Sequence, residues 1–247
     1  MISSGLTDAG FLSILLGFGL VGIIGIVVLG GLAVVGVYFL GSGARRKKRA
    51  RLSSFAAGIG WSYQEDADHL RGRWRGDPFR SVPAQRFEHL VSGEFRGRPA
   101  AVFEYEYKTG TGEDRSTVVH TVTMLSLPAA LPDVELTWEG PGAALVKALG
   151  GQDIQFESED FNRCWRVTGT VLKTAHDVVH PRFMEFMLAG PPDPLRFEGA
   201  NVWTWHRGHL EPAAIDARLE RLARAADLVP RHVWQDYGHD PTATARD

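Results

Sequence analysis

The strongest hydrophobic pattern in the chain lies near its N-terminus. Residues 9–44 contain no Asp, Glu, Lys or Arg, and residues 11–40 are almost wholly Phe, Leu, Ile, Val, Ala and Gly. A helix that crosses the hydrocarbon core of a bilayer needs about 20 apolar residues. This run exceeds that need and is too long for a buried helix of a soluble protein. The pattern therefore predicts a transmembrane helix over residues 11–41, preceded by a short extracytoplasmic N-terminus, residues 1–10.

A cleaved signal peptide is the nearest alternative to a membrane anchor. Residues 1–10 contain neither Lys nor Arg, although a signal peptide begins with a positively charged region. The apolar run is also about twice as long as the apolar region of a signal peptide, which spans about 7–15 residues. The only cysteine is Cys164, far downstream of the position that a lipoprotein anchor requires. These features favour the transmembrane helix.

A cluster of cations follows the apolar run. Lys and Arg occupy six of seven positions, whereas the N-terminal side has none. The positive-inside rule therefore predicts an N-terminus outside the cell membrane and a C-terminal domain in the cytoplasm. The single Cys164 fits that reducing compartment. Next to the membrane these cations would also contact anionic headgroups, at about 1 kcal/mol each. Specific lipid or nucleic-acid recognition is the competing interpretation of the six residues Arg45, Arg46, Lys47, Lys48, Arg49 and Arg51.

The predicted transmembrane helix is rich in glycine. Small residues allow membrane helices to approach closely, but no Gly-x-x-x-Gly pair is present. A plain anchor is the simpler interpretation, and weak self-association remains the alternative. It would use the glycines at positions 17, 19, 22, 25, 30, 31 and 36.

Beyond a basic juxtamembrane helix, residues 42–60, the hydrophobic pattern changes to the alternation of strands. Residues 86–94 and 101–108 alternate apolar and polar positions, which is the period of a half-buried strand. Residues 116–127 and 134–138 predict two more strands, separated by prolines. Four consecutive strands of this kind favour an antiparallel meander.

The second half of the chain mixes short helices and strands. Ser158 is placed as an N-cap, Pro181 at the first position of a helix, and Pro212 at the start of the longest helix. An extended segment at 167–172 and a hairpin around Gly199 lie between these helices. The pattern predicts an α+β cytoplasmic domain over 61–238, of mainly antiparallel strands with packing helices, and a disordered tail over 239–247.

The charge of the soluble part argues against a nucleic-acid partner. Residues 52–247 carry a net charge of −7, whereas a nucleic-acid binder is basic on at least one face. Residues 71–98 are a local exception with a net charge of +4. Scattered arginines of this kind more often lie on a solvent-exposed surface, paired with nearby acidic residues, than form a binding site for an acidic partner.

One constellation suggests metal chemistry. His176 and His180 are four residues apart with Asp177 between them, a spacing that lets two imidazoles on a helix share a metal. Pro181 follows directly, however, and disfavours helical geometry at His180. The two imidazoles then do not share a face, and no metal site is predicted.

The other candidate groups also have simpler structural explanations. Cys164 with His206 or His209 would form a thiolate pair, but its apolar neighbours favour a small buried hydrophobe. Trp203 and Trp205 share a strand face, a pattern that favours packing in the core over a binding surface for an aromatic or sugar ligand. The glycine-rich stretches 140–142 and 150–151 lack the Gly-Lys-Ser/Thr ending of a phosphate loop. No catalytic residue and no cofactor is therefore predicted.

Several short motifs resemble those of a known family. After the hydrophobic helix and its basic stop come Gly-Trp-Ser-Tyr at 60–63, Gly-Arg-Pro at 97–99 and Phe-Glu-Tyr-Glu-Tyr at 103–107. Leu-Pro-Ala-Ala-Leu-Pro at 127–132 and Phe-Glu-Ser-Glu-Asp-Phe-Asn-Arg at 156–163 follow. Together they resemble uncharacterised single-pass membrane proteins of high-GC bacteria. The resemblance implies the same topology and supplies no active-site residues.

Two functions are compatible with this pattern. The first is a membrane-tethered interaction or scaffold module with a protein partner, because no set of catalytic residues is evident. The second is a membrane-anchored enzyme or small-molecule sensor. Its pocket would be built from scattered residues such as His176, Asp177, His180 and Trp205.

Overall fold

The computed structural model divides the chain into two units, residues 1–51 and 52–247. The predicted transmembrane helix 11–41 and the tail 239–247 lie outside the described residues. So does a short helix that the sequence predicts over 143–149, where Gly150 and Gly151 would end it. Within the described part, no helix combines the length and apolar character that crossing a membrane requires. The described residues are 43–79, 82, 84–110, 112, 115–139 and 154–238.

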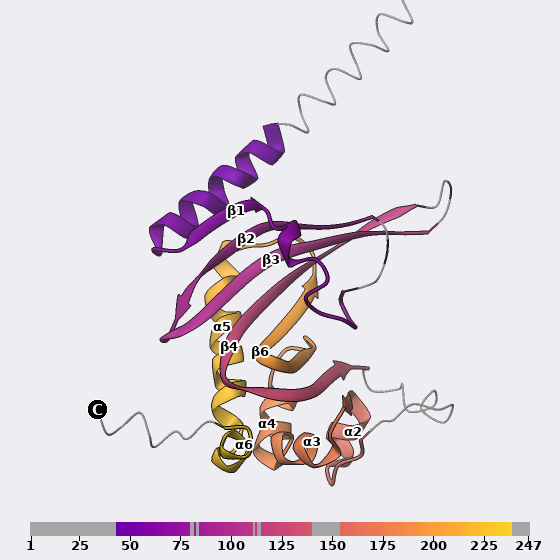
Figure 1. Ribbon diagram of the computed structural model, residues 1–247. Coiled ribbons are helices and arrows are strands. Elements are labelled where there is room, and N and C mark those ends of the chain that lie inside the picture. The colour runs from indigo at the N-terminus through magenta and orange to yellow at the C-terminus, as the bar shows by residue number, and fades with distance from the viewer. Residues whose placement is uncertain are drawn as a thin grey trace, which may run out of the picture. The chain divides into compact units, whose positions relative to one another are not determined.

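An antiparallel sheet of six strands forms the centre of the second unit (Figure 1). Its first four strands follow one another as an antiparallel meander, in which β2, β3 and β4 contain the four predicted strands and β1 is an additional one. The last two strands both pair with the fourth, β4. The predicted class, antiparallel strands with packing helices, is confirmed. The strands are β1 (Ser62–Asp66), β2 (Gln85–Phe95), β3 (Arg98–Thr109), β4 (Ser116–Trp138), β5 (Trp165–Gly169) and β6 (Leu195–Arg207).

Strand β4 is continuous where the sequence predicts two strands. The prediction that Pro128 and Pro132 end a strand is wrong. The ladder to β3 ends at Leu125, and the register to β6 shifts between Ser126 and Leu131 and again beyond it. Proline lacks the N–H that a regular ladder uses, so strands tolerate it at irregular positions of this kind.

Strand β6 is likewise continuous, and the predicted hairpin around Gly199 is wrong. Gly199 has a φ of +56° and pairs with Leu131, at the place where the β4–β6 register shifts. Its left-handed backbone is therefore absorbed as a bulge in an unbroken strand, and the chain does not reverse there.

The helices begin where the capping residues predict. Ser158 accepts a hydrogen bond from the Phe161 N–H at 3.3 Å, Pro181 opens α4, and a 3-10 turn (Pro212–Ala214) leads into the longest helix, α5. In Figure 1, α5 lies along one face of the sheet, and α2, α3, α4 and α6 gather near the C-terminal end of β4. The helices are α2 (Glu159–Cys164), α3 (Leu172–Val178), α4 (Pro181–Ala189), α5 (Ile215–Leu228) and α6 (Arg231–Asp236), and residues 43–58 are also helical.

Each face of the sheet carries its own hydrophobic cluster. The helix-side cluster includes Leu125 and Leu136 of β4 together with the buried residues of α4 and α5. The loop-side cluster contains six aromatic side chains of the sheet: Phe87 of β2, Phe103, Tyr105 and Tyr107 of β3, and Trp203 and Trp205 of β6. Leu70, Trp74 and Phe79 of the loop between β1 and β2 pack on it. One face is therefore covered by helices and the other by a loop.

A buried carboxylate ties the chain before α5 to the sheet. Glu104 of β3 is 3% exposed and accepts the Leu210 N–H at 2.6 Å. Its other oxygen lies 3.0 Å from His209 Nδ1. A hydrogen bond between a buried charge and a backbone N–H holds this segment in place.

Removal of the Glu104 carboxylate should destabilise the fold. Glu104→Ala leaves the buried Leu210 N–H without its acceptor, which costs about 1–3 kcal/mol. Urea unfolding of the full chain in detergent, followed by tryptophan fluorescence, measures the change. Glu106→Ala, two residues along the same strand, is the matched control. If Glu104→Ala and Glu106→Ala lost the same free energy of unfolding, the proposed role of Glu104 in holding the segment before α5 would be contradicted.

Candidate functional site

The residues of the metal hypothesis do not converge. His176 lies on α3, whereas His180 is the N-cap residue of α4, outside the helix as predicted. The His180 Nε2 donates to the Leu228 carbonyl at 2.9 Å, and Asp177 accepts from Lys173 at 3.0 Å. In the described part of the chain, no group of three or more His, Cys, Asp or Glu side chains is arranged to hold a metal.

The thiol and tryptophan candidates belong to the core. Cys164 ends α2 and packs against the helix-side cluster, while His209 pairs with Glu104 on β3. Trp203 and Trp205 lie in the loop-side cluster, buried as the packing interpretation predicts. His176, Asp177, His180 and Trp205 therefore do not form the predicted pocket. Trp205 lies in the loop-side cluster, whereas α3 packs on the helix-side cluster.

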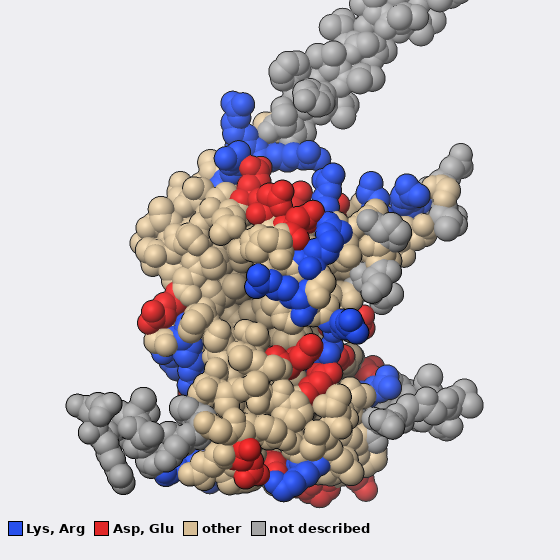
Figure 2. Space-filling model, viewed as in Figure 1, with Lys and Arg blue, Asp and Glu red and all other residues tan. Residues whose placement is uncertain are grey.

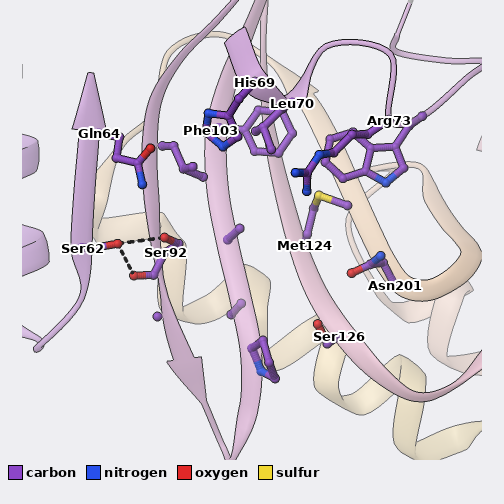
Figure 3. Close-up of a pocket in the computed structure, with 16 residues that line it drawn as sticks. Ser62, Gln64, His69, Leu70, Arg73, Ser92, Phe103, Met124, Ser126 and Asn201 are labelled. Atoms are coloured by element: carbon purple, nitrogen blue, oxygen red, sulfur yellow. Dashed lines mark hydrogen bonds between the residues drawn. The ribbon is translucent and has the colours of Figure 1, made fainter. Parts of the chain in front are cut away.

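A trough is present where the loop leaves the second face of the sheet partly uncovered (Figure 3). Its volume is about 610 Å³, and it is open to solvent. It extends across the strands, from Ser62 and Gln64 on β1 to Asn201 on β6. This trough is the candidate site.

The register of the sheet sets the floor of the trough. Ser62 pairs with Ser92, Ser92 with Ala101, and Ala101 with Met124, which in turn pairs with Trp203. These residues form one row across the strands on the same face. Because three of them are Ser or Ala, the surface is hollow on the β1 side and rises toward the large side chains of Met124 and Trp203.

The wall of the trough combines an aromatic stack with polar groups. Trp74 stacks on Phe103 with ring centroids 5.8 Å apart, beside Arg73 of the same loop. In Figure 3 the Arg73 side chain reaches toward Met124, and Asn201 lies on the same side of the trough. The lining therefore offers apolar contact together with donors and acceptors. Such a mixture is typical of a binding surface.

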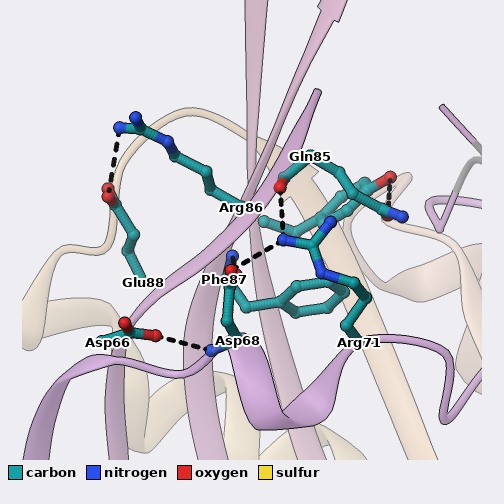
Figure 4. Close-up of polar contacts among 8 residues, drawn as sticks. Asp66, Asp68, Arg71, Gln85, Arg86, Phe87 and Glu88 are labelled. Atoms are coloured by element: carbon teal, nitrogen blue, oxygen red, sulfur yellow. Dashed lines mark hydrogen bonds and ion pairs between the residues drawn. The ribbon is translucent and has the colours of Figure 1, made fainter. Parts of the chain in front are cut away.

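The loop that forms the wall is fastened by Asp68 (Figure 4). The Asp68 carboxylate accepts the Phe87 N–H at 3.1 Å and lies 2.7 Å from the Arg71 guanidinium. Arg71 also donates to the Gln85 carbonyl at 2.7 Å. In addition, Asp66 accepts the Asp68 N–H at 2.8 Å. The short 3-10 turn η1 (Asp68–Leu70) is thereby fixed to the start of β2.

The charge on Asp68 is stabilised in the folded state. Burial by itself raises the pKa of Asp68, but the hydrogen bond from Phe87 and the Arg71 cation together hold this pKa below its ordinary value. A lowered folded-state pKa contributes stability above the unfolded-state pKa, and that stability is lost as the pH falls through the folded-state value.

Asp68→Asn should lower the melting temperature at pH 7 by about 2–4 °C, the shift expected for about 1 kcal/mol in a domain of this size. The extra stability of the wild-type chain needs the ionised carboxylate. The difference in melting temperature between the two chains should therefore shrink as the pH falls below about 4. Thermal unfolding of the full chain at several pH values measures it. Exposed Glu157→Gln is the control. A difference that does not vary with pH would contradict the role of the charge.

The basic stretch 71–98 is largely a paired surface, as its structural interpretation predicts. Arg96 lies 2.7 Å from Glu220, and Arg98 lies 2.7 Å from Asp227, both on α5. Figure 2 shows Lys and Arg interspersed with Asp and Glu on the face in view. Arg73, by contrast, lines the trough.

The sequence contained only a weak signal for the trough. Alternation along β2 assigns Leu90 and Ser92 to the same face, but it does not say which residues of other strands join them. The six juxtamembrane cations lie in the helix of residues 43–58. Their role in setting the membrane topology stays a prediction.

Comparison with known proteins adds evidence about the fold. Neither a protein-family model nor a curated protein matches the chain. A solved structure, the mycobacterial trehalose monomycolate transport factor A, TtfA, superposes with a TM-score of 0.51 at 20% identity. The match covers 73% of this chain and 93% of that one. At this identity the likeness concerns the fold.

Proposed function

We propose that this chain is a non-catalytic, membrane-tethered interaction module whose trough receives a segment of a protein partner. The observation that carries the proposal is the trough itself. It has an apolar floor of Ala101 and Met124 and hydrogen-bonding groups at its rim, including Gln64 and Asn201. Its shape and lining suit the side chains of another protein.

The structural neighbour is compatible with a role in a transport process. Its name describes a factor for the transport of trehalose monomycolate, and its chain is covered almost completely by this fold. We propose that the present chain likewise assists a transport process by binding a protein.

Tethering belongs to the same proposal. The apolar residues 11–41 would anchor the chain in the cell membrane, and the six cations that follow would hold the trough on the cytoplasmic side. Anchorage keeps the binding domain near a membrane-embedded partner and so raises the effective concentration of the pair.

The orientation is tested with reporters fused to the C-terminus. Green fluorescent protein should fluoresce and alkaline phosphatase should be inactive, because the domain faces the cytoplasm. Replacement of the six cations by glutamine should weaken this preference, since orientation follows Lys and Arg next to the helix. An active phosphatase fusion of the wild-type chain would contradict the predicted topology.

Binding through the trough is tested by in-cell crosslinking and affinity capture of the full chain. Ser126→Trp fills the trough and should reduce the recovery of a specific partner at least about tenfold, as loss of about 1.4 kcal/mol does. Ser116→Trp, on the exposed start of the same strand, should leave recovery unchanged. A foreign transmembrane helix in place of residues 9–44 should also leave it unchanged. Partner recovery that is insensitive to Ser126→Trp would remove the trough from the interface.

A small-molecule sensor is the second candidate function. The trough volume of about 610 Å³ lies within the range of small-ligand sites, about 300–1,000 Å³. His69 and Arg73 are the titratable side chains that line it. Native mass spectrometry of the full chain separates the two functions. A bound metabolite that Ser126→Trp displaces would favour the sensor.

A further inference from the structure

A second hollow lies on the helix-covered side of the sheet, away from the trough. Its volume is about 470 Å³. The end of α4, the segment before β6, one residue of β6 and the first half of α5 all contribute to it. Its lining includes Phe186, Pro191, Asp193, Thr204, Arg218 and Arg221.

The two arginines of this hollow are not matched by carboxylates. Arg218 and Arg221 are both half-buried on α5. In the described part of the chain, neither forms an ion pair with Asp or Glu. Asp193 is the acid in the lining, and it acts on both guanidinium groups from beyond ion-pair distance. The hollow therefore has an excess of positive charge.

The guanidinium group of Arg221 is held by an aromatic ring and a thioether sulfur, which is a weak hydrogen-bond acceptor. Its Cζ lies 5.2 Å from the centre of the Phe186 ring, and its Nη2 lies 3.7 Å from Met187 Sδ. Its Nε is buried with no hydrogen-bond partner. The buried guanidinium of Arg196, by contrast, contacts Asp133 at 2.8 Å and Glu135 at 3.0 Å. The contrast indicates that Arg221 is positioned for a partner from outside the chain.

Burial also disfavours the charged form of both guanidinium groups, because it removes them from water. It lowers the pKa of Arg218 and of Arg221, and the distant Asp193 offsets only part of the effect. Nearby, burial and then Arg218 lower the pKa of His206. A guanidinium removed from water is stabilised by an oxyanion that accepts two of its N–H groups at once.

We propose that this hollow binds an organic anion. Arg218 and Arg221 hold its single phosphate or carboxylate group, and Phe186 and Pro191 contact an apolar portion of the same molecule. The anion is either a soluble metabolite or the headgroup of an anionic lipid, since both carry this chemistry.

Gly190 offers a way to disturb the site without changing its charge. A Cβ at this position would collide with the Arg221 guanidinium, which is the flexible end of its side chain. Gly190 has a φ of −95°, so alanine fits its backbone. Gly190→Ala should therefore displace the guanidinium group and leave the fold intact.

The test is isothermal titration of the full chain in phosphatidylcholine nanodiscs with octyl phosphate, and with octanol as the neutral probe. Octyl phosphate should bind and octanol should not. Arg218→Gln, Arg221→Gln and Gly190→Ala should each weaken binding at least about tenfold, the scale of a lost hydrogen bond to a charged group. Arg224→Gln removes one exposed cation from the same helix and should change the affinity less than about twofold. Thermal unfolding confirms that each variant is folded.

Three results would overturn the proposal: no binding of octyl phosphate by the wild-type chain, equal binding of octanol, or equal losses for Arg224→Gln and the two site arginines. The source of the anion follows from a second titration in discs that contain phosphatidylglycerol. If phosphatidylglycerol weakens the binding of octyl phosphate to the wild-type chain but not to Arg218→Gln, the site belongs to a lipid headgroup. An unchanged affinity for octyl phosphate assigns it to a soluble anion.

Discussion

The rest of the fold depends on the pairing of a single strand with three others. The 23 residues of β4 pair with β3 at their beginning, with β5 at their end and with β6 along most of their length. The register shift between Leu131 and Val134 lets both residues face the helix-side cluster although they are three positions apart. Without that shift, the alternation of a regular strand would turn Val134 and Leu136 toward the opposite face.

The two faces of the sheet are completed by different means. Helices α4 and α5 bring long apolar side chains to one face. The other face is covered by a loop whose aromatic residues reach only part of the sheet. Asp68 holds this loop at one end through the Phe87 N–H, and Gly76 lies against the Arg196 guanidinium at the other. The trough is the part of the face that this short cover does not reach.

The two hollows differ in chemistry, and this difference suggests a division of roles. The trough is broad, with mixed polarity, and suits a segment of protein. The smaller hollow beside α5 concentrates two half-buried cations against apolar side chains and suits an anionic molecule. Both depend on β6, because Asn201 faces the trough and Thr204 faces the hollow. The metal and thiol candidates from the sequence, by contrast, are distributed over separate elements of the described chain.

The sequence by itself determined the fold class and many of the elements, although α3 begins at Leu172, inside the segment 167–172 that was predicted to be extended. Alternation in β2 and β3, the Ser158 cap and the prolines that open helices are local features, and local sterics and hydrogen bonding determine them. The continuity of β4 and β6 could not be predicted, because whether Pro128 or Gly199 breaks a strand depends on the pairing of neighbouring strands. The sites were also beyond the sequence. The row from Ser62 to Trp203 draws on five strands. Among the described residues no carboxylate forms an ion pair with Arg221, and this depends on which acids the fold brings within reach. These are relations between distant residues, so only the tertiary structure decided them.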